Sequence, residues 1–154
     1  MSFEQEKEKF ECYLNKNHVW VLATGSQNEI SARSMSIINE GLKIYFQSDI
    51  HFEKYRHIFE NPNIALCCGN YQVKGTAQIM GSTTDAANTE IMAHYQRVHP
   101  SSYERYSRKK DSFLVEIEPR SVQIWDYIEN EPVITRINLI LKTAEIEKYE
   151  TWSE

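Results

Sequence analysis

Hydrophobic residues recur in the first part of the chain with two different periods, one helical and one extended. Phe3, Phe10 and Leu14 are spaced by seven and four residues, with acids and lysines between them, which predicts an amphipathic helix. The run Val19 to Thr24 is apolar and rich in β-branched and aromatic side chains, and the turn formers Gly-Ser-Gln-Asn follow at 25–28. This run is therefore predicted to be a strand that enters a hairpin.

The hairpin is predicted to continue as a meander. The segment Glu29 to Ile38 reads as a strand because its side chains divide between two faces. One face holds Ile30, Ala32, Ser34 and Ser36, and the other holds Ser31, Arg33, Met35 and Ile37. Turn formers at 39–41 then precede a returning strand predicted at Leu42 to Gln47.

A short helix is predicted to separate this meander from the later strands. Phe52, Tyr55 and Phe59 are spaced helically, and the helix must end before Pro62 because proline cannot continue it. The later strands are predicted at Asn63 to Cys68, Tyr71 to Met80, Phe113 to Glu118, Val122 to Tyr127 and Val133 to Leu141. Gly75 indicates a bulge or a close backbone approach.

The segment between the later strands has a different composition. Asp85 to Tyr95 favours a helix, and the polar, basic stretch up to Lys110 is predicted to be helix or loop. We therefore expect an α+β fold with about seven antiparallel strands, closed into a small barrel because open edges invite aggregation. No repeat or linker divides residues 1–154, so a single domain is predicted.

Charge and composition narrow the class of protein. With 17 Lys plus Arg against 22 Asp plus Glu the net charge is −5, which disfavours general nucleic-acid binding. The sequence has no apolar run of membrane-spanning length and no apolar segment near its start, so we expect a cytoplasmic protein without a membrane partner. Cys12, Cys67 and Cys68 are expected to be reduced thiols, since no metal-ligand or C-x-x-C spacing accompanies them.

Several catalytic signatures are missing, but one constellation suits a phosphate group. The sequence holds no Walker A loop, G-x-G-x-x-G, H-E-x-x-H or G-x-S-x-G motif. Arg33 lies on an early predicted strand, Gln47 and Ser48 end the returning strand, and Lys54 falls in the first turn of the following helix. Two cations, a hydroxyl and a helix N-terminus are what a phosphate dianion requires.

Three runs carry a resemblance to a known family. VLATGSQNEISARSMSII, IYFQSDIHFEKYRHIFENPNIAL and VKGTAQIMG resemble the pyridoxamine 5'-phosphate oxidase-like family of FMN-binding split barrels. More narrowly, they are similar to the short members described as general stress protein 26-like or nitroimidazole-resistance-like. The resemblance covers about Val19 to Gly81 well and the rest loosely, and it lies in the order of elements rather than in one motif.

The resemblance implies a homodimer of split β-barrels with FMN at the subunit interface and a small-molecule substrate. Arg33, Ser48 and Lys54 match the family's phosphate ligands, and Gln47 precedes that serine at the strand end. The other implied FMN contacts are Ser34, Met35 and Ser36 beside the flavin ring, Thr76 on the glycine-containing strand and Trp125 from the partner subunit. The resemblance implies an FMN-dependent oxidoreductase, and no side chain stands out as a catalytic residue.

One departure from the family pattern leaves alternatives open. Phe52-Glu53-Lys54 stands where the oxidase has Ser-Arg-Lys, so an acid replaces one phosphate-binding cation. The oxidase's long C-terminal portion has no clear counterpart, which argues against true pyridoxamine 5'-phosphate oxidase activity. The alternative is a non-enzymatic dimer that lacks flavin, with Arg33 and Lys54 paired to acids such as Glu29, Glu53 or Asp49, or a dimer that binds another planar ligand such as heme.

Overall fold

Residues 2–149, the part of the chain that this computed structural model describes, place nine antiparallel strands in one sheet. The strands are β1 (Val19–Ser26), β2 (Glu29–Ser36), β3 (Ile38–Glu40), β4 (Lys43–Asp49), β5 (Asn63–Cys68), β6 (Tyr71–Ser82), β7 (Ser112–Ile128), β8 (Glu131–Asn138) and β9 (Thr143–Lys148). The helices are α1 (Phe3–Lys16), α2 (Glu53–Glu60), α3 (Thr89–Val98) and α4 (Pro100–Ser102), with short helical turns at Ala86–Asn88 and Tyr103–Ser107.

The N-terminal helix forms as its apolar spacing predicts. Ser2 and Gln5 make a capping box that satisfies backbone N–H groups at the start of α1. Phe10 and Leu14 are fully buried against the sheet. The predicted hairpin is also present. The strands β1 and β2 pair along their whole length, from Ser26 opposite Glu29 at the turn to Val19 opposite Ser36 at the far end.

The ends of the sheet are brought together by the chain itself. The strand order runs β2-β1-β5-β6-β7-β4-β3, and β2 and β3 stand at its two ends. Only Ile37 separates these two strands, its side chain is buried, and its N–H donates to the His18 carbonyl at 2.8 Å. The sheet therefore curls into a barrel around one hydrophobic core, as predicted, without a ladder between β2 and β3.

The two strands predicted at Phe113 to Glu118 and Val122 to Tyr127 are one strand, β7. Its first half pairs with β4 and its second half with β8, while β6 pairs with it from Phe113 to Ile124. The register shifts at Gly75 because Arg120 is an extra residue opposite it, which is the predicted bulge. A Cβ on Gly75 would lie 2.6 Å from the Glu118 carbonyl oxygen, so only glycine fits this approach.

Two other predictions are corrected. Residues 39 and 40, expected in a turn, belong to the short strand β3, and the turn centres on Gly41 instead. The polar strand β9 was not predicted, because its alternation of Ala144 and Ile146 with charged residues is too weak to stand out. Its pairing with β8, which is set by the tertiary fold, makes it a strand.

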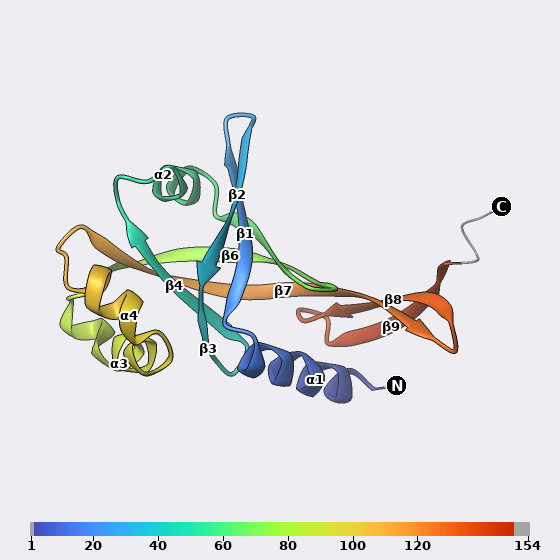
Figure 1. Ribbon diagram of the computed structural model, residues 1–154. Coiled ribbons are helices and arrows are strands. Elements are labelled where there is room, and N and C mark those ends of the chain that lie inside the picture. The colour runs from blue at the N-terminus through green and yellow to red at the C-terminus, as the bar shows by residue number, and fades with distance from the viewer. Residues whose placement is uncertain (1, 150–154) are drawn as a thin grey trace.

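Figure 1 shows β7 running the length of the molecule. The helices α3 and α4 lie at one end of this strand, and the β8–β9 hairpin lies at the other. The helix α2 lies on the side from which the β1–β2 hairpin projects. Within residues 2–149, no helix combines the length and apolar character that a membrane span requires.

Candidate functional site

A cavity of about 330 Å³ lies at the start of α2. Its walls come from β2, β4, the beginning of α2 and the helical segment between β6 and β7. Six of the residues predicted to bind a cofactor line it together: Ser34, Met35, Ser36, Gln47, Ser48 and Lys54. Residues from two strands and a helix, far apart in the sequence, therefore converge as the phosphate hypothesis expects.

Lys54 is the main charged feature of this cavity. The residue is only 8% exposed, and its Nζ lies 4.6 Å from the centre of the Phe52 ring. Among residues 2–149 no carboxylate lies within 4.0 Å of this ammonium group. Burial, together with the charge of Arg33, lowers the pKa of Lys54 to about 8. A buried cation with a lowered pKa and no ion pair would be stabilised by an anion.

The start of α2 supports the same chemistry. Phe52 is the N-cap residue and its side chain makes no capping hydrogen bond, while the acid of the first turn, Glu53, is directed to Ser31 and His57. Ser48, which carries a hydroxyl, lines the same cavity as Phe52 and Lys54, whose backbone N–H groups belong to the start of α2. These are the groups that bind a phosphate at a helix N-terminus.

Two other lining residues are held by the protein itself. Gln47 is buried, accepts a hydrogen bond from Ser107 and donates to Ser102 at 3.4 Å. Asp49 accepts hydrogen bonds from the backbone N–H and the ring of His51 at 2.9 and 2.6 Å, and these bonds lower the pKa of its carboxyl group. Asp49 thus bonds to His51, and its charge also acts on Lys54, where it partly offsets the lowering of the lysine pKa.

Arg33 lies next to the cavity but does not line it. Its guanidinium donates to the Leu22 carbonyl at 3.3 Å and to the Thr24 hydroxyl at 2.8 Å. It is close enough to Lys54 to lower the pKa of that lysine, and among residues 2–149 it has no carboxylate within 4.0 Å. Neither Arg33 nor Lys54 therefore has an acid at ion-pair distance, although the charge of Glu53 partly offsets the lowering of the Arg33 pKa by burial, and the charge of Asp49 acts likewise on the pKa of Lys54.

The remaining predicted contacts, Thr76 and Trp125, are not part of the cavity. Thr76 pairs with Asn63 on β5 and with Glu118 on β7. Trp125 lies on β7, is 40% exposed, and its ring centre is 5.8 Å from that of Tyr149. Neither residue reaches the cavity of its own chain, so their predicted role depends on a second subunit.

The helical segment before β7 supplies a further wall of the cavity. Tyr95, Ser102, Tyr106 and Lys109 line the cavity, with the Tyr95 hydroxyl 2.9 Å from the Ser102 hydroxyl. Lys109 brings a second lysine to the site. Tyr95 ends the segment predicted as a helix, and the other three residues lie in the polar stretch predicted as helix or loop; only the fold brings this segment back to β4.

Glu53, the acid that replaces a family cation, faces away from the cavity. Its carboxylate accepts a hydrogen bond from Ser31 and lies 3.4 Å from Nε2 of His57. The hydrogen bond from Ser31 is the main cause that lowers the pKa of Glu53. The consecutive residues Glu53 and Lys54 therefore lie in different environments, and the Glu53 carboxylate is not among the side chains that line the cavity with Lys54.

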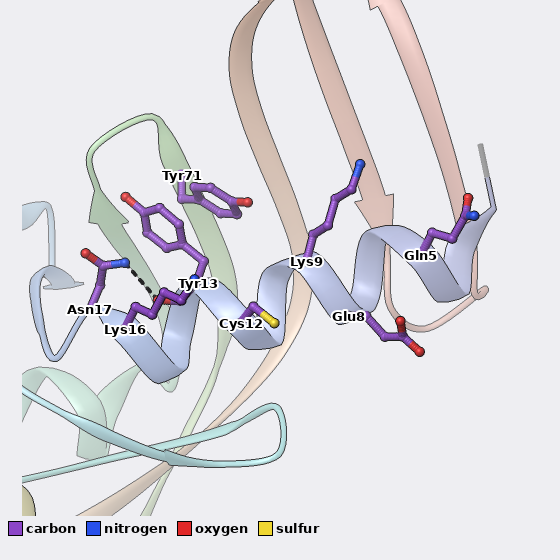
Figure 2. A pocket seen from close by; sticks show the side chains of 8 residues that line it. All are labelled: Gln5, Glu8, Lys9, Cys12, Tyr13, Lys16, Asn17 and Tyr71. Atoms are coloured by element: carbon purple, nitrogen blue, oxygen red, sulfur yellow. Dashed lines mark hydrogen bonds between the residues drawn. The ribbon is translucent and has the colours of Figure 1, made fainter.

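A second, more open groove lies between α1 and β6 (Figure 2). Its volume is about 580 Å³, and Tyr13 and Tyr71 form its aromatic wall with ring centres 3.8 Å apart. The Tyr13 hydroxyl donates to the Cys68 carbonyl, and burial with the Cys68 contact raises the pKa of Tyr13 to about 12. This phenol remains protonated, and none of the predicted cofactor contacts lies in this groove.

The fold and the site together define a class of protein. The Pyridoxamine 5'-phosphate oxidase family matches residues 6–126, and the chain belongs to this family. General stress protein 26 of Bacillus subtilis is 26% identical over 137 residues, which cover 86% of this chain and 97% of that protein. The family prediction drawn from the three sequence runs is therefore confirmed.

Solved structures confirm the split-barrel fold. A pyridoxamine 5'-phosphate oxidase-related, FMN-binding protein from Nostoc punctiforme superposes with a TM-score of 0.59 at 13% identity, covering 94% of each chain. HutZ, a heme storage protein from Vibrio cholerae, gives 0.63 at 12% identity and covers 80% of this chain and 95% of its own. At these identities the likeness establishes the architecture alone.

Proposed function

We propose that this protein binds FMN and acts as an FMN-dependent oxidoreductase on a small molecule. The observation that supports this most directly is the buried, unpaired Lys54 beside the uncapped start of α2. The family includes proteins described as FMN-binding, such as the one from Nostoc punctiforme. The cavity volume, about 330 Å³, lies near the lower end of the range of about 300–1,000 Å³ typical of ligand sites.

The residues of the cavity fit the phosphate end of FMN. Lys54 would supply a point charge to the phosphate, and Ser48 and the first-turn N–H groups of α2 would donate hydrogen bonds. Arg33, behind Lys54, would add positive potential or turn from Thr24 to the phosphate. Glu53 stands where the family has a second phosphate-binding cation. Lys109, which also lines the cavity, would supply a positive charge in its place.

The same cavity would position the flavin ring. Bound FMN supplies hydride and electron transfer through its isoalloxazine ring. Ser34, Met35 and Ser36 would run beside this ring, while Tyr95 and Tyr106 exclude water from one side. No acid, base or nucleophile is assigned, because positioning a substrate against the ring is the task that these residues can perform.

The proposal includes a homodimer with FMN at the subunit interface. Val19, Val21 and Ile30 are 56%, 41% and 83% exposed on the β1–β2 hairpin, and apolar surface of this kind favours association. Thr76 and Trp125 lie outside the cavity of their own chain, and in the proposed dimer Trp125 reaches the flavin of the other subunit. A monomer in light scattering would contradict this part of the proposal.

Heme is the second ligand considered, since HutZ has the same fold. Protein heme sites supply an axial ligand, most often His, Cys, Met or Tyr. No His or Cys is among the described residues that line the cavity. Met35, Tyr95 and Tyr106 do line it, but the serine hydroxyls beside the uncapped start of α2 match a phosphate dianion better than the propionates of a heme.

The deciding experiment is an absorption and fluorescence titration of the protein with FMN and with riboflavin, which lacks the phosphate. Saturable binding of FMN that riboflavin does not match is expected. Arg33→Ala together with Lys54→Ala should weaken FMN binding at least about tenfold, equivalent to about 1.4 kcal/mol. Lys16→Ala, an exposed lysine on α1, is the matched control and should bind FMN normally. No binding of FMN at all would refute the proposal.

A further inference from the structure

A second cluster of ionisable groups lies on the other side of α2, outside the cavity described above. It consists of Glu29 on β2 and Glu53 and His57 on α2, whose ligand atoms all lie within 4.8 Å of one another. His57 is completely buried, whereas Glu29 and Glu53 are 57% and 45% exposed. The two carboxylates therefore form a rim over a buried imidazole.

The imidazole is oriented toward these carboxylates. Its Nδ1 lies 2.9 Å from the Thr24 hydroxyl, which also accepts a hydrogen bond from Arg33. Its Nε2 is buried and makes no hydrogen bond, although Glu53 and Glu29 oxygens lie 3.4 and 4.0 Å away. A buried ring nitrogen without a partner is a costly feature that requires an explanation.

What this point requires depends on the tautomer of His57, since the Thr24 hydroxyl can accept a hydrogen bond from Nδ1 or donate one to it. If the Nδ1–H donates to Thr24, the Nε2 lone pair faces two carboxylates, and three electron-rich groups converge. Such an arrangement is stable only with a proton or a metal ion among them. Arg56, whose guanidinium lies 3.1 Å from Glu29, neutralises part of the charge at the rim, and the charges of Arg56 and Arg33 also act on Glu53.

We propose that Glu29, Glu53 and His57 bind a divalent transition-metal ion such as Zn²⁺. Zinc bonds of about 2.0–2.2 Å to nitrogen and oxygen place tetrahedral ligands about 3.3 Å apart, close to the 3.4 Å between His57 Nε2 and Glu53. The 4.0 Å to Glu29 needs only a small movement of an exposed side chain. The Nδ1 contact with Thr24 is the kind of outer hydrogen bond that orients a ligating histidine.

One imidazole and two carboxylates match borderline cations rather than Ca²⁺ or Mg²⁺. Three protein ligands leave a position open to water, and the exposed rim gives the ion a path to the site. The site would tie α2 to the β1–β2 hairpin, because Glu29 follows the hairpin turn and the other two ligands lie on the helix. This proposal stands independently of flavin binding.

The test is a calorimetric titration of chelator-treated protein with Zn²⁺, carried out in a Cys12→Ser, Cys67→Ser background to remove the exposed thiols. One Zn²⁺ per chain is expected. Glu29→Gln and Glu53→Gln should each weaken binding at least about tenfold. Glu40→Gln is the matched control, because Glu40 is a similarly exposed acid 3.1 Å from a different histidine, His94.

A second measurement guards against other sites. Co²⁺ in place of Zn²⁺ should give visible bands without sulfur-to-metal charge transfer, and His57→Gln should abolish them. Failure to bind either ion would mean that a proton on His57 balances the two carboxylates, and would overturn the proposal. Binding that survives Glu29→Gln and Glu53→Gln, or that is lost in an Asp49→Asn variant beside His51, would overturn it equally.

Discussion

Glu53 and Lys54 are neighbours at the start of α2, yet they lie in oppositely charged parts of the molecule. Lys54 is buried beside the serines and tyrosines of the cavity and is near Arg33, a second cation. Glu53 faces Ser31 and the buried His57 with a second acid, Glu29, close by. Successive side chains on a helix point about 100° apart, so a single turn can serve two sites.

This contrast changes how the acid at position 53 is to be interpreted. Compared with the family pattern, Glu53 replaces a phosphate-binding cation, which suggests a weakened FMN site. In the fold, its carboxylate faces Ser31 and His57, away from the cavity, and the charge of Arg33, beside the cavity, also helps to lower its pKa. We infer that anion binding depends on Lys54, and that Glu53 belongs to a separate group.

The largest expected effect comes from reversing the charge on the cavity side. Lys54→Glu would add a buried carboxylate near Asp49 and remove the one cation at the start of α2 that lines the cavity. FMN affinity should fall by at least about a hundredfold, or about 2.7 kcal/mol, whereas riboflavin affinity should change far less. Fluorescence titration measures both, and equal losses for the two ligands would mean that the variant had damaged the cavity itself.

A smaller effect is expected from the proton on Lys54. Its pKa falls from 10.5 to about 8 in the folded protein without ligand, so the unfolded chain binds more protons between these values. Stability should therefore rise with pH across this range, by on the order of 1 kcal/mol from about pH 7.5 to about pH 9.5. Urea unfolding of the flavin-free protein measures this rise. The increase should be missing in Lys54→Met, and an identical rise in both proteins would assign it to other groups.

The smallest effect is expected from Glu53→Gln. Because this carboxylate faces Ser31 and His57 rather than the cavity, FMN affinity should change by less than about threefold, below about 0.7 kcal/mol. The same titration measures it, with Lys16→Ala as the reference for an unrelated charge. A tenfold gain in FMN affinity would show that Glu53 opposes the phosphate directly, and the separation of the two sites would then be wrong.

Local sequence patterns predicted much of the fold. The first helix, the β1–β2 hairpin and the bulge at Gly75 follow from side-chain periodicity and from turn chemistry within a few residues. Where Pro119 falls inside β7, the local signal suggested two strands, although the chain continues as one with different partners on each half. Proline lacks the N–H that a ladder bond needs, and in β7 Pro119 lies opposite Gly75 at the bulge, where the register with β6 shifts.

The sequence by itself determined that residues such as Ser48 and Lys54 end a strand and begin a helix, because turn and helix signals act locally. Only the tertiary structure decided what surrounds them. The wall formed by Tyr106 and Lys109, and the direction of Glu53 toward His57, depend on segments that meet through long-range packing. No local period encodes such contacts, since the energy that places a side chain in one cavity or another comes from the complete arrangement of the sheet and helices.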